Sequence, residues 1–164
     1  MTGEAKKEHA MTIRQATIND CDALAPLFVQ LANLHIAGRP DIFKAAPKLS
    51  KKDLKKFIKS DNRYFTVAEI NGEIIGISNW QLKKCCDNET LSDRTFAVID
   101  EIIISESHRR KGYGKLLFEK TVKLASEKGA DSIELYVWNF NEDAKNFYEA
   151  LGMKPQRTLL ELKI

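Results

Sequence analysis

The chain is poor in cysteine: Cys21, Cys85 and Cys86 are the only three, an odd number with one adjacent pair. This set gives neither a secreted disulfide framework nor a CxxC zinc knuckle, and no His, Cys or carboxylate spacing suggests another metal. No apolar run approaches the roughly 20 residues that a membrane span needs. The first ten residues lack the apolar core of a secretory signal. These absences predict a reducing, cytoplasmic location.

The chain also lacks a large excess of either charge, because 26 basic and 23 acidic residues leave a net charge of +3. This balance permits an anionic ligand but lacks the dense basic surface of a nucleic-acid binder. An RNA-binding role for the lysine-rich segment 51–59 is therefore disfavoured, and its lysines are interpreted as a solvated helix face. With 164 residues, 43% of them hydrophobic, the chain suits one globular domain. We expect a flexible leader over residues 1–10 and a single domain over 11–164.

Hydrophobic periodicity predicts the order of the elements. Apolar residues at helical spacing predict a helix that Gly38 and Pro40 end, and Ser50 caps a short helix through Lys59. Two more helices follow a glycine cluster at 112–114 and end at Gly129 and Gly152. Alternating or continuous apolar runs predict strands at 12–16, 64–70, 74–77, 94–104, 132–138 and 159–162, the second and third joined by an Asn-Gly turn. This order predicts a mixed sheet covered by helices, an α/β (mixed α+β) fold.

The segment 102–117 carries the clearest chemical signal: a strand, a basic glycine-containing loop, and a helix. Glycines at such a turn let the backbone approach a ligand closely, and a helix N-terminus adds partial positive charge. Arg109, Arg110 and Lys111 add formal charge, so the loop predicts a phosphate or pyrophosphate site. The sequence does not match a Walker loop or a dinucleotide fingerprint, which would need other residues at 109, 116 and 117.

Two blocks together resemble a known family. Arg109-x-x-Gly112-x-Gly114 after a strand resembles the pyrophosphate loop of the GNAT superfamily of N-acetyltransferases. Asn141-x-x-Ala144-x-x-Phe147-Tyr148-Glu149-x-x-Gly152-Met153 resembles that superfamily's downstream motif, with Met in place of the more frequent Phe at the last position. The resemblance implies a mixed, mostly antiparallel sheet of six to seven strands with a splayed parallel pair, flanked by about four helices. Within that superfamily, this sequence is similar to the polyamine and amine acetyltransferase members of bacterial type.

The resemblance also implies that the chain binds acetyl-CoA. The pantetheine arm would lie between the strands 99–104 and 132–138 and bond to the backbone of the first. The residues expected to contact the cofactor are Ile102, Ile103, Ile104, Arg109, Arg110, Lys111, Gly112, Tyr113, Gly114, Lys115 and Asn141.

Three residues are candidates for proton transfer. Tyr148 matches the tyrosine that protonates the coenzyme A sulfur in many members, and a phenol can supply that proton in a dry pocket. Asp100 and Glu101 are adjacent on a strand, which predicts side chains on opposite faces, only one of them toward the acceptor. Either carboxylate could relay the amine proton through water.

The acceptor stays open among polyamines, aminoglycosides, amino acids, peptide N-termini and lysine side chains. The carboxylates Asp41, Asp100 and Glu101 favour a cationic primary amine, and His35 and Arg39 lie in the segment that covers the acceptor side in the family. The apolar last strand allows a homodimer. The competing hypothesis is a non-catalytic acyl-CoA-binding sensor, which would keep the glycine loop but would not need Tyr148.

Overall fold

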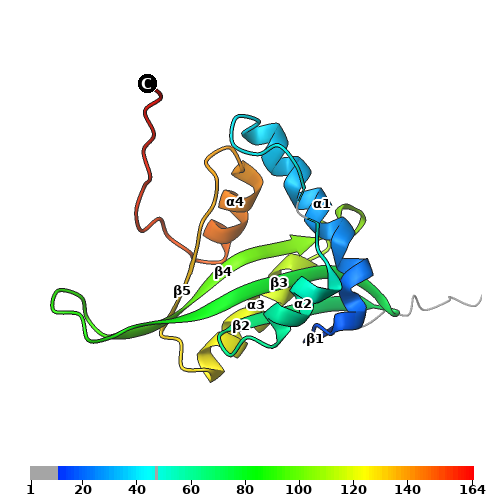
Figure 1. The fold of residues 1–164 in the computed structure, drawn as a ribbon, viewed down its shortest axis with the longest axis horizontal. Helices are drawn as coiled ribbons and strands as arrows, with labels where there is room; N and C mark the ends of the chain where they lie inside the picture. Colours follow the sequence, from blue (N-terminus) through cyan, green and yellow to red (C-terminus); the bar gives the residue numbers. More distant parts are fainter. Residues whose placement is uncertain (1–10, 47) are drawn as a thin grey trace, which may run out of the picture.

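A five-stranded sheet with the order β1-β2-β3-β4-β5 runs through the protein (Figure 1). The computed structural model describes residues 11–46 and 48–164, so the predicted leader lies outside the described residues. The strands are β1 Thr12–Gln15, β2 Arg63–Ile70, β3 Glu73–Cys85, β4 Arg94–Ile104 and β5 Ser132–Leu135. The helices are α1 Cys21–Gly38, α2 Lys51–Ile58, α3 Tyr113–Glu127 and α4 Glu142–Ala150, with short 3-10 turns η1 Ile18–Asp20 and η2 Glu106–His108.

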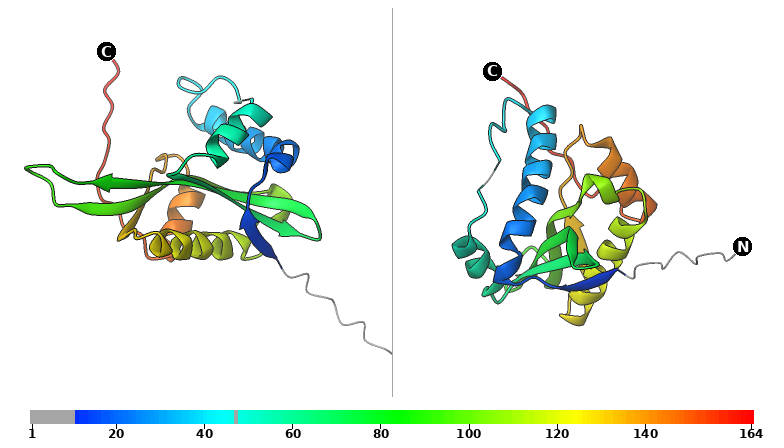
Figure 2. Two further views of the ribbon diagram at one scale, coloured as in Figure 1. Left: turned by 60° about the horizontal axis from the view of Figure 1, so that its bottom comes forward. Right: turned by 90° about the vertical axis from the view of Figure 1, so that its right-hand side faces the viewer.

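The helices lie on both faces of the sheet (Figure 2). Leu24 and Leu27 of α1 and Leu54 of α2 are buried against one face, together with inward-facing residues of β2 and β3. Leu117 and Phe118 of α3 are buried on the other face. Each helix contributes one apolar stripe to the core, which is the arrangement that its sequence periodicity predicts.

The hairpin between β2 and β3 confirms the turn prediction. Asn71 and Gly72 have φ values of 53° and 82°, the left-handed backbone that a two-residue turn of this kind requires. The prediction for the short helix is also confirmed: the Ser50 hydroxyl accepts from the backbone N–H of Asp53 at 3.1 Å. The turn joins β2 and β3 as an antiparallel pair.

The last two strands form the parallel pair and then separate. β4 pairs with β5 only from Phe96↔Ser132 to Ile99↔Leu135, and β5 ends there, although the predicted strand extended to Trp138. β4 continues for five more residues to Ile104, paired with β3 but no longer with β5. The sheet therefore opens between β4 and the chain that follows β5.

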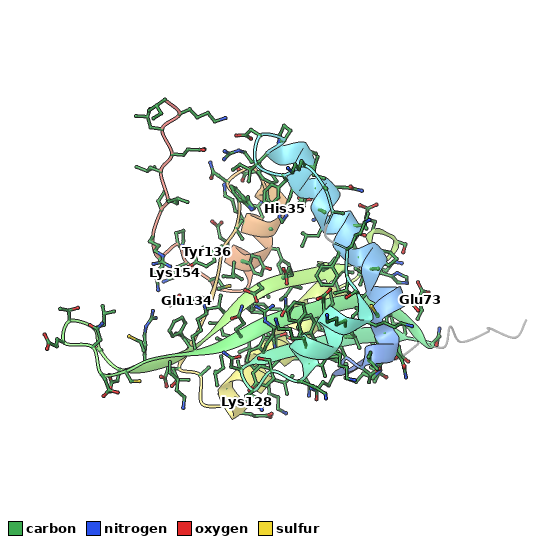
Figure 3. All side chains as sticks on the ribbon, viewed as in Figure 1. His35, Glu73, Lys128, Glu134, Tyr136 and Lys154 are labelled. Carbon is green, nitrogen blue, oxygen red and sulfur yellow. The ribbon has the colours of Figure 1, made fainter. Side chains whose placement is uncertain are left out.

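The predicted strand over 159–162 is absent, so the expected six to seven strands are not matched among the described residues. The segment after α4 contacts β5 through side chains, with Arg157 donating to the Tyr136 hydroxyl at 2.6 Å and Gln156 to Glu134 at 3.4 Å. Side chains of β5 and of the chain after it gather there (Figure 3). No backbone ladder joins the two segments, and without one an apolar run does not become a strand. Leu159, Leu160 and Leu162 are consequently 94%, 86% and 86% exposed.

Aromatic side chains join the end of α1 to the segment after β5. The His35 ring stacks on Phe43 and meets the edge of Phe140, and Trp138 stacks on Phe140. Arg39 lies over the Trp138 ring and forms ion pairs with Asp41 and Glu161 at 2.9 and 2.8 Å. Among the described residues, no helix has the length and apolarity to cross a membrane.

Candidate active site

The loop from β4 to α3 is anchored before it reaches its glycines. The carbonyl of Ile104 accepts from the Gln30 amide of α1 at 3.0 Å and from the Arg109 guanidinium at 3.2 Å. The Gln30 carbonyl oxygen also accepts from the backbone N–H of Glu106 at 2.9 Å. One side chain of α1 thus clamps both the end of the strand and the start of the loop.

Beyond this anchor the backbone exposes a row of N–H groups. Arg110 and Gly112 have φ values of 59° and 85°, and alternating left-handed residues turn successive N–H groups toward one concave side. The first helical hydrogen bond of α3 is donated by Leu116 to Gly112 at 3.2 Å. The N–H groups of residues 110–115 donate to no backbone or side-chain acceptor in the described part of the chain. Such unpaired donors at a helix N-terminus form an anion site.

The charges around the loop agree with this interpretation. No acidic residue lies in the first turn of α3, and no side chain caps the helix. Lys115 lies there instead, where a positive charge opposes the helix dipole unless an anion is bound. Lys111 donates to the carbonyl of Ser107 at 2.9 Å, and Arg110 pairs with Asp143 of α4 at 3.0 Å. The Arg110 pair is exposed, so solvent weakens it and leaves the guanidinium accessible.

The glycines of the loop differ in their surroundings. A Cβ at Gly112 would meet no atom within 4 Å, and at Gly114 it would lie 3.5 Å from the Phe147 ring, an ordinary contact. At Gly114, therefore, neither steric crowding nor a positive φ requires glycine. A close backbone approach by a ligand is the remaining physical reason for a glycine there. Tyr113 is half-buried, with its ring 6.4 Å from the ring of His108.

The exposed edge of β4 presents alternate residues. Ser105 donates its backbone N–H to Ile75 of β3 at 2.7 Å, so by antiparallel alternation Ile103 also turns its backbone toward β3. Ile102 and Ile104 therefore direct their backbone groups away from β3. Because the Ile104 carbonyl already accepts from Gln30 and Arg109, the backbone groups of Ile102 and the N–H of Ile104 remain open on the side where β5 has separated. The structure places these two residues, and not Ile103, at the edge expected to bind the pantetheine arm.

Asp100 and Glu101 lie on the same face of the sheet, and the expectation of opposite faces is wrong. Asn79 pairs with Glu101, whereas the next residue of β3, Trp80, pairs with Ile99. Asp100 is thus the extra residue of a β-bulge, which breaks the alternation of side chains. Glu101 accepts from the Asn79 amide, and Asp100 accepts from Gln81 at 2.6 Å. Asn79 and Gln81 are two residues apart on one strand and so share a face.

The two carboxylates differ in their electrostatics. Arg63 of β2 lies 3.3 Å from Asp100, and the Asp100 side chain is 25% exposed. Glu101 is more buried, and burial, together with the nearby charge of Asp100, raises its pKa against the lowering effects of Asn79 and Arg63. Of the two carboxylates near the point where β4 and β5 part, Glu101 is thus the more buried one and forms no ion pair in the described part of the chain.

Tyr148 lies on α4, on the side that faces α3. Its ring is 6.0 Å from Phe118 and 5.1 Å from Phe147, and its hydroxyl has no hydrogen bond within the described ranges. Burial raises the pKa of Tyr148 to about 12. The phenol therefore stays protonated at neutral pH and is available as a donor. No contact between Tyr148 and the two carboxylates is found in the described residues.

Asn141 caps α4: its Oδ1 accepts from the backbone N–H of Ala144 at 3.1 Å. Only its amide N–H groups remain for a ligand. Sequence reasoning missed Gln30, Asn79 and Gln81, because isolated amide residues on a helix or strand carry no motif. Their only signal is a polar side chain inside an otherwise apolar run, as Asn79 is in β3.

Two parallel strands that separate, followed by a helix whose first backbone N–H groups are unpaired, are the features of an anion-binding α/β domain. Sequence comparison gives the particular family. Residues 28–153 match the family model described as Acetyltransferase (GNAT) family. The chain belongs to that family.

Individual relatives agree with this assignment. An uncharacterized N-acetyltransferase of Methanocaldococcus jannaschii is 28% identical over 151 residues, which cover 90% of this chain but only 62% of that relative. The solved structure of a tetramutant of the BH1408 protein from Bacillus halodurans has a TM-score of 0.89 at 30% identity, covering 93% of this chain and 99% of that one. The aminoglycoside N-acetyltransferase AAC(6')-Iy in complex with CoA, with a TM-score of 0.77 at 18% identity and coverages of 98% and 99%, shows a similar fold.

Proposed function

We propose that this protein transfers an acetyl group from acetyl-CoA to a primary amine, by direct attack and without a covalent enzyme intermediate. The observation that carries the proposal is the row of unpaired N–H groups from residue 110 to 115, beside the opening between β4 and β5. These groups would bind the diphosphate of the coenzyme. The backbone of Ile102, the N–H of Ile104 and the Asn141 amide would hold its pantetheine arm. A bound CoA in the aminoglycoside acetyltransferase of similar fold supports this choice of ligand.

The reaction needs two proton transfers. The amine enters as an ammonium ion, loses one proton, and its nitrogen attacks the thioester carbonyl carbon. The C–N bond forms and the C–S bond breaks, which gives an amide and a thiolate. Glu101 or Asp100 takes the amine proton, directly or through water, and Tyr148 gives its proton to the departing sulfur. A phenol with a pKa of about 12 is a weak acid, but a thiolate released into a dry pocket is a strong enough base to accept its proton.

We propose a cationic amine as the acceptor. Asp100 and Glu101 place two carboxylates on one face of the sheet, and the ion pair found there among the described residues joins Arg63 to Asp100 alone. This face therefore keeps excess negative charge, which attracts an ammonium group. Asp41 contributes less than the sequence suggested, because it forms ion pairs with Arg39 and Lys163 at 2.9 and 2.8 Å.

Thiol release during incubation of the protein with acetyl-CoA and a panel of amines tests the function. The panel should include polyamines, aminoglycosides, amino acids and peptides, and mass spectrometry should identify the acetylated product. We expect release that depends on both substrates. A folded protein that binds acetyl-CoA tightly but acetylates none of these amines would contradict the proposal and favour a sensor of the coenzyme.

We also propose that the chain forms a homodimer through its last residues. Leu159, Leu160 and Leu162 are almost fully exposed, and β5 has a backbone ladder only on its β4 side. An exposed apolar segment beside an open sheet edge favours pairing between chains. Light scattering after size-exclusion chromatography should show a dimer that the change of Leu160 and Leu162 to Asp dissociates. A monomeric wild-type protein at micromolar concentration would contradict this assembly.

A further inference from the structure

Two amide–carboxylate pairs lie side by side across β3 and β4, and they differ in one respect. In the first pair, Gln81 donates to Asp100, which Arg63 also approaches to 3.3 Å. In the second pair, Asn79 donates to Glu101, which has no ion pair with any described residue. Asp100 is thus held by a cation and an amide, whereas Glu101 is held by an amide alone.

Asn79 is costly for the fold. It is 3% exposed, and register places it between Phe65 of β2 and Glu101 of β4. Its amide nitrogen donates to Glu101, but its Oδ1 is buried without a hydrogen-bond partner among the described residues. A buried polar atom left unpaired disfavours folding. Packing alone therefore does not account for an asparagine at this position.

We propose that Asn79 is a positioning residue that fixes Glu101 as the proton acceptor for the amine, whereas Asp100 stays paired with Arg63 and does not take the proton. This inference rests on the proposed acetyltransferase function. The Asn79 hydrogen bond occupies Oε2 of Glu101 and leaves Oε1 as the free acceptor. The β-bulge at Asp100 turns both carboxylates to this face. Their different roles therefore come from their different hydrogen-bond and ion-pair partners, and not from side chains that point in opposite directions.

The physical reason lies in basicity. Asp100 is neutralised by its ion pair with Arg63. Glu101 is shielded from water, and the two charged groups that act on it are the adjacent Asp100, which raises its pKa, and Arg63, which lowers it. Asn79 stabilises the ionised carboxylate without adding charge, and burial keeps the pKa of Glu101 above its usual value. Loss of the Asn79 donor would raise the pKa of Glu101 further.

The acid limb of the pH profile of kcat/KM tests this assignment, with Gln81 as the matched control. Asn79→Ala removes the donor and should move the limb to higher pH by about one unit. Asn79→Asp keeps the shape but adds a like charge, and should move it further. Gln81→Ala removes the equivalent donor from Asp100 and should leave the limb in place. Asn79→Ser, which keeps a hydroxyl donor, should restore part of the wild-type profile and covers the case in which Asn79→Ala does not fold.

A second readout does not depend on turnover. Carbon-13 NMR titration of the Glu101 carboxyl should show a higher pKa in Asn79→Ala than in the wild type and no change in Gln81→Ala. An unmoved Glu101 titration, or an acid limb that follows Gln81 and not Asn79, would overturn the inference. A wild-type protein without turnover would refute the proposed function instead, and the titration would then still decide whether Asn79 controls Glu101.

Discussion

Gly38 at the end of α1 lies directly against the ring of Phe140, in the segment that joins β5 to α4. A Cβ at Gly38 would overlap the Phe140 ring, so no other residue fits without a shift of the ring or the helix. The contact holds the end of α1 beside the chain that leaves β5. It sets the spacing between the two segments expected to surround the acceptor.

Gly38→Ala should destabilise the protein by about 1–3 kcal/mol, the usual penalty for overpacking, although alanine is the better helix former. Urea unfolding measures the change. The matched test is the double variant with Phe140→Ala, which removes the ring and should make the effect of Gly38→Ala much smaller. Additive effects of the two substitutions would show that the contact is not what makes Gly38 necessary.

Gly114→Ala should separate the binding of the coenzyme from the stability of the fold. The added methyl group makes only an ordinary contact with Phe147, and alanine in the first turn of α3 should leave stability unchanged or slightly higher. The affinity for CoA in calorimetry should nevertheless fall at least tenfold, roughly 1.4 kcal/mol or more, because the methyl group blocks the approach to the N–H groups. If the wild type and Gly114→Ala bind CoA with equal affinity, the loop is not part of the binding site.

Tyr148→Phe should lower kcat by roughly 10²-fold, as loss of a general acid does. The affinity for acetyl-CoA should change little, since the hydroxyl is expected to act on the departing sulfur. The free energy of unfolding should not fall, because the hydroxyl has no hydrogen bond among the described residues. Tyr64→Phe is a suitable control, since that hydroxyl donates to the carbonyl of Asp61 at 3.1 Å, away from the proposed site. Full activity of Tyr148→Phe would favour the role of a coenzyme sensor.

Low pH should reduce the free energy of unfolding through Asp20. Arg14 lowers the pKa of Asp20 to about 2 through hydrogen bonds of 2.8 and 2.9 Å. The folded pKa lies below the unfolded value, so the ionised form favours folding. This stabilisation is complete above about pH 4 and is lost as the pH falls toward 2. It amounts to about 1–2 kcal/mol after allowance for solvent around Arg14.

Unfolding of Asp20→Asn in denaturant at several pH values checks this. The variant should be less stable than the wild type at pH 6 and nearly equal at pH 2. Asp22→Asn alters an exposed carboxylate 3.4 Å from Lys51 and should change little at either pH. A constant difference between Asp20→Asn and the wild type over the whole range would show that the charge of Asp20 does not contribute.

The sequence predicted those parts of the fold that local signals determine. The Asn71-Gly72 turn, the Ser50 cap and the four apolar helix faces each depend on residues close in the chain. The glycine loop could be predicted for the same reason, because Gly112 and Gly114 sit between a buried strand and an amphipathic helix. These signals suffice for the helices, the first sheet pairings and the loop that we assign to the coenzyme.

The parts that depend on pairing between distant residues could not be predicted. The bulge at Asp100 arises from the register of β4 on β3, which no local pattern encodes, and it places Asp100 and Glu101 on one face where opposite faces were expected. The run at 159–162 has the apolar composition of a strand, but a strand forms only where a partner offers its backbone. Asn79 could be found only once register placed it opposite Glu101.

The early end of β5 has a thermodynamic consequence. It leaves the backbone groups of Ile102 and the N–H of Ile104 on an edge that a pantetheine amide can complete, so the ligand would act as a substitute for the missing length of strand. Binding to the folded chain alone shifts the unfolding equilibrium by mass action, by about 2.7 kcal/mol at a hundredfold excess over Kd. The melting temperature of this protein would then rise with the concentration of its coenzyme, because the bound pantetheine arm would complete the last segment of the sheet.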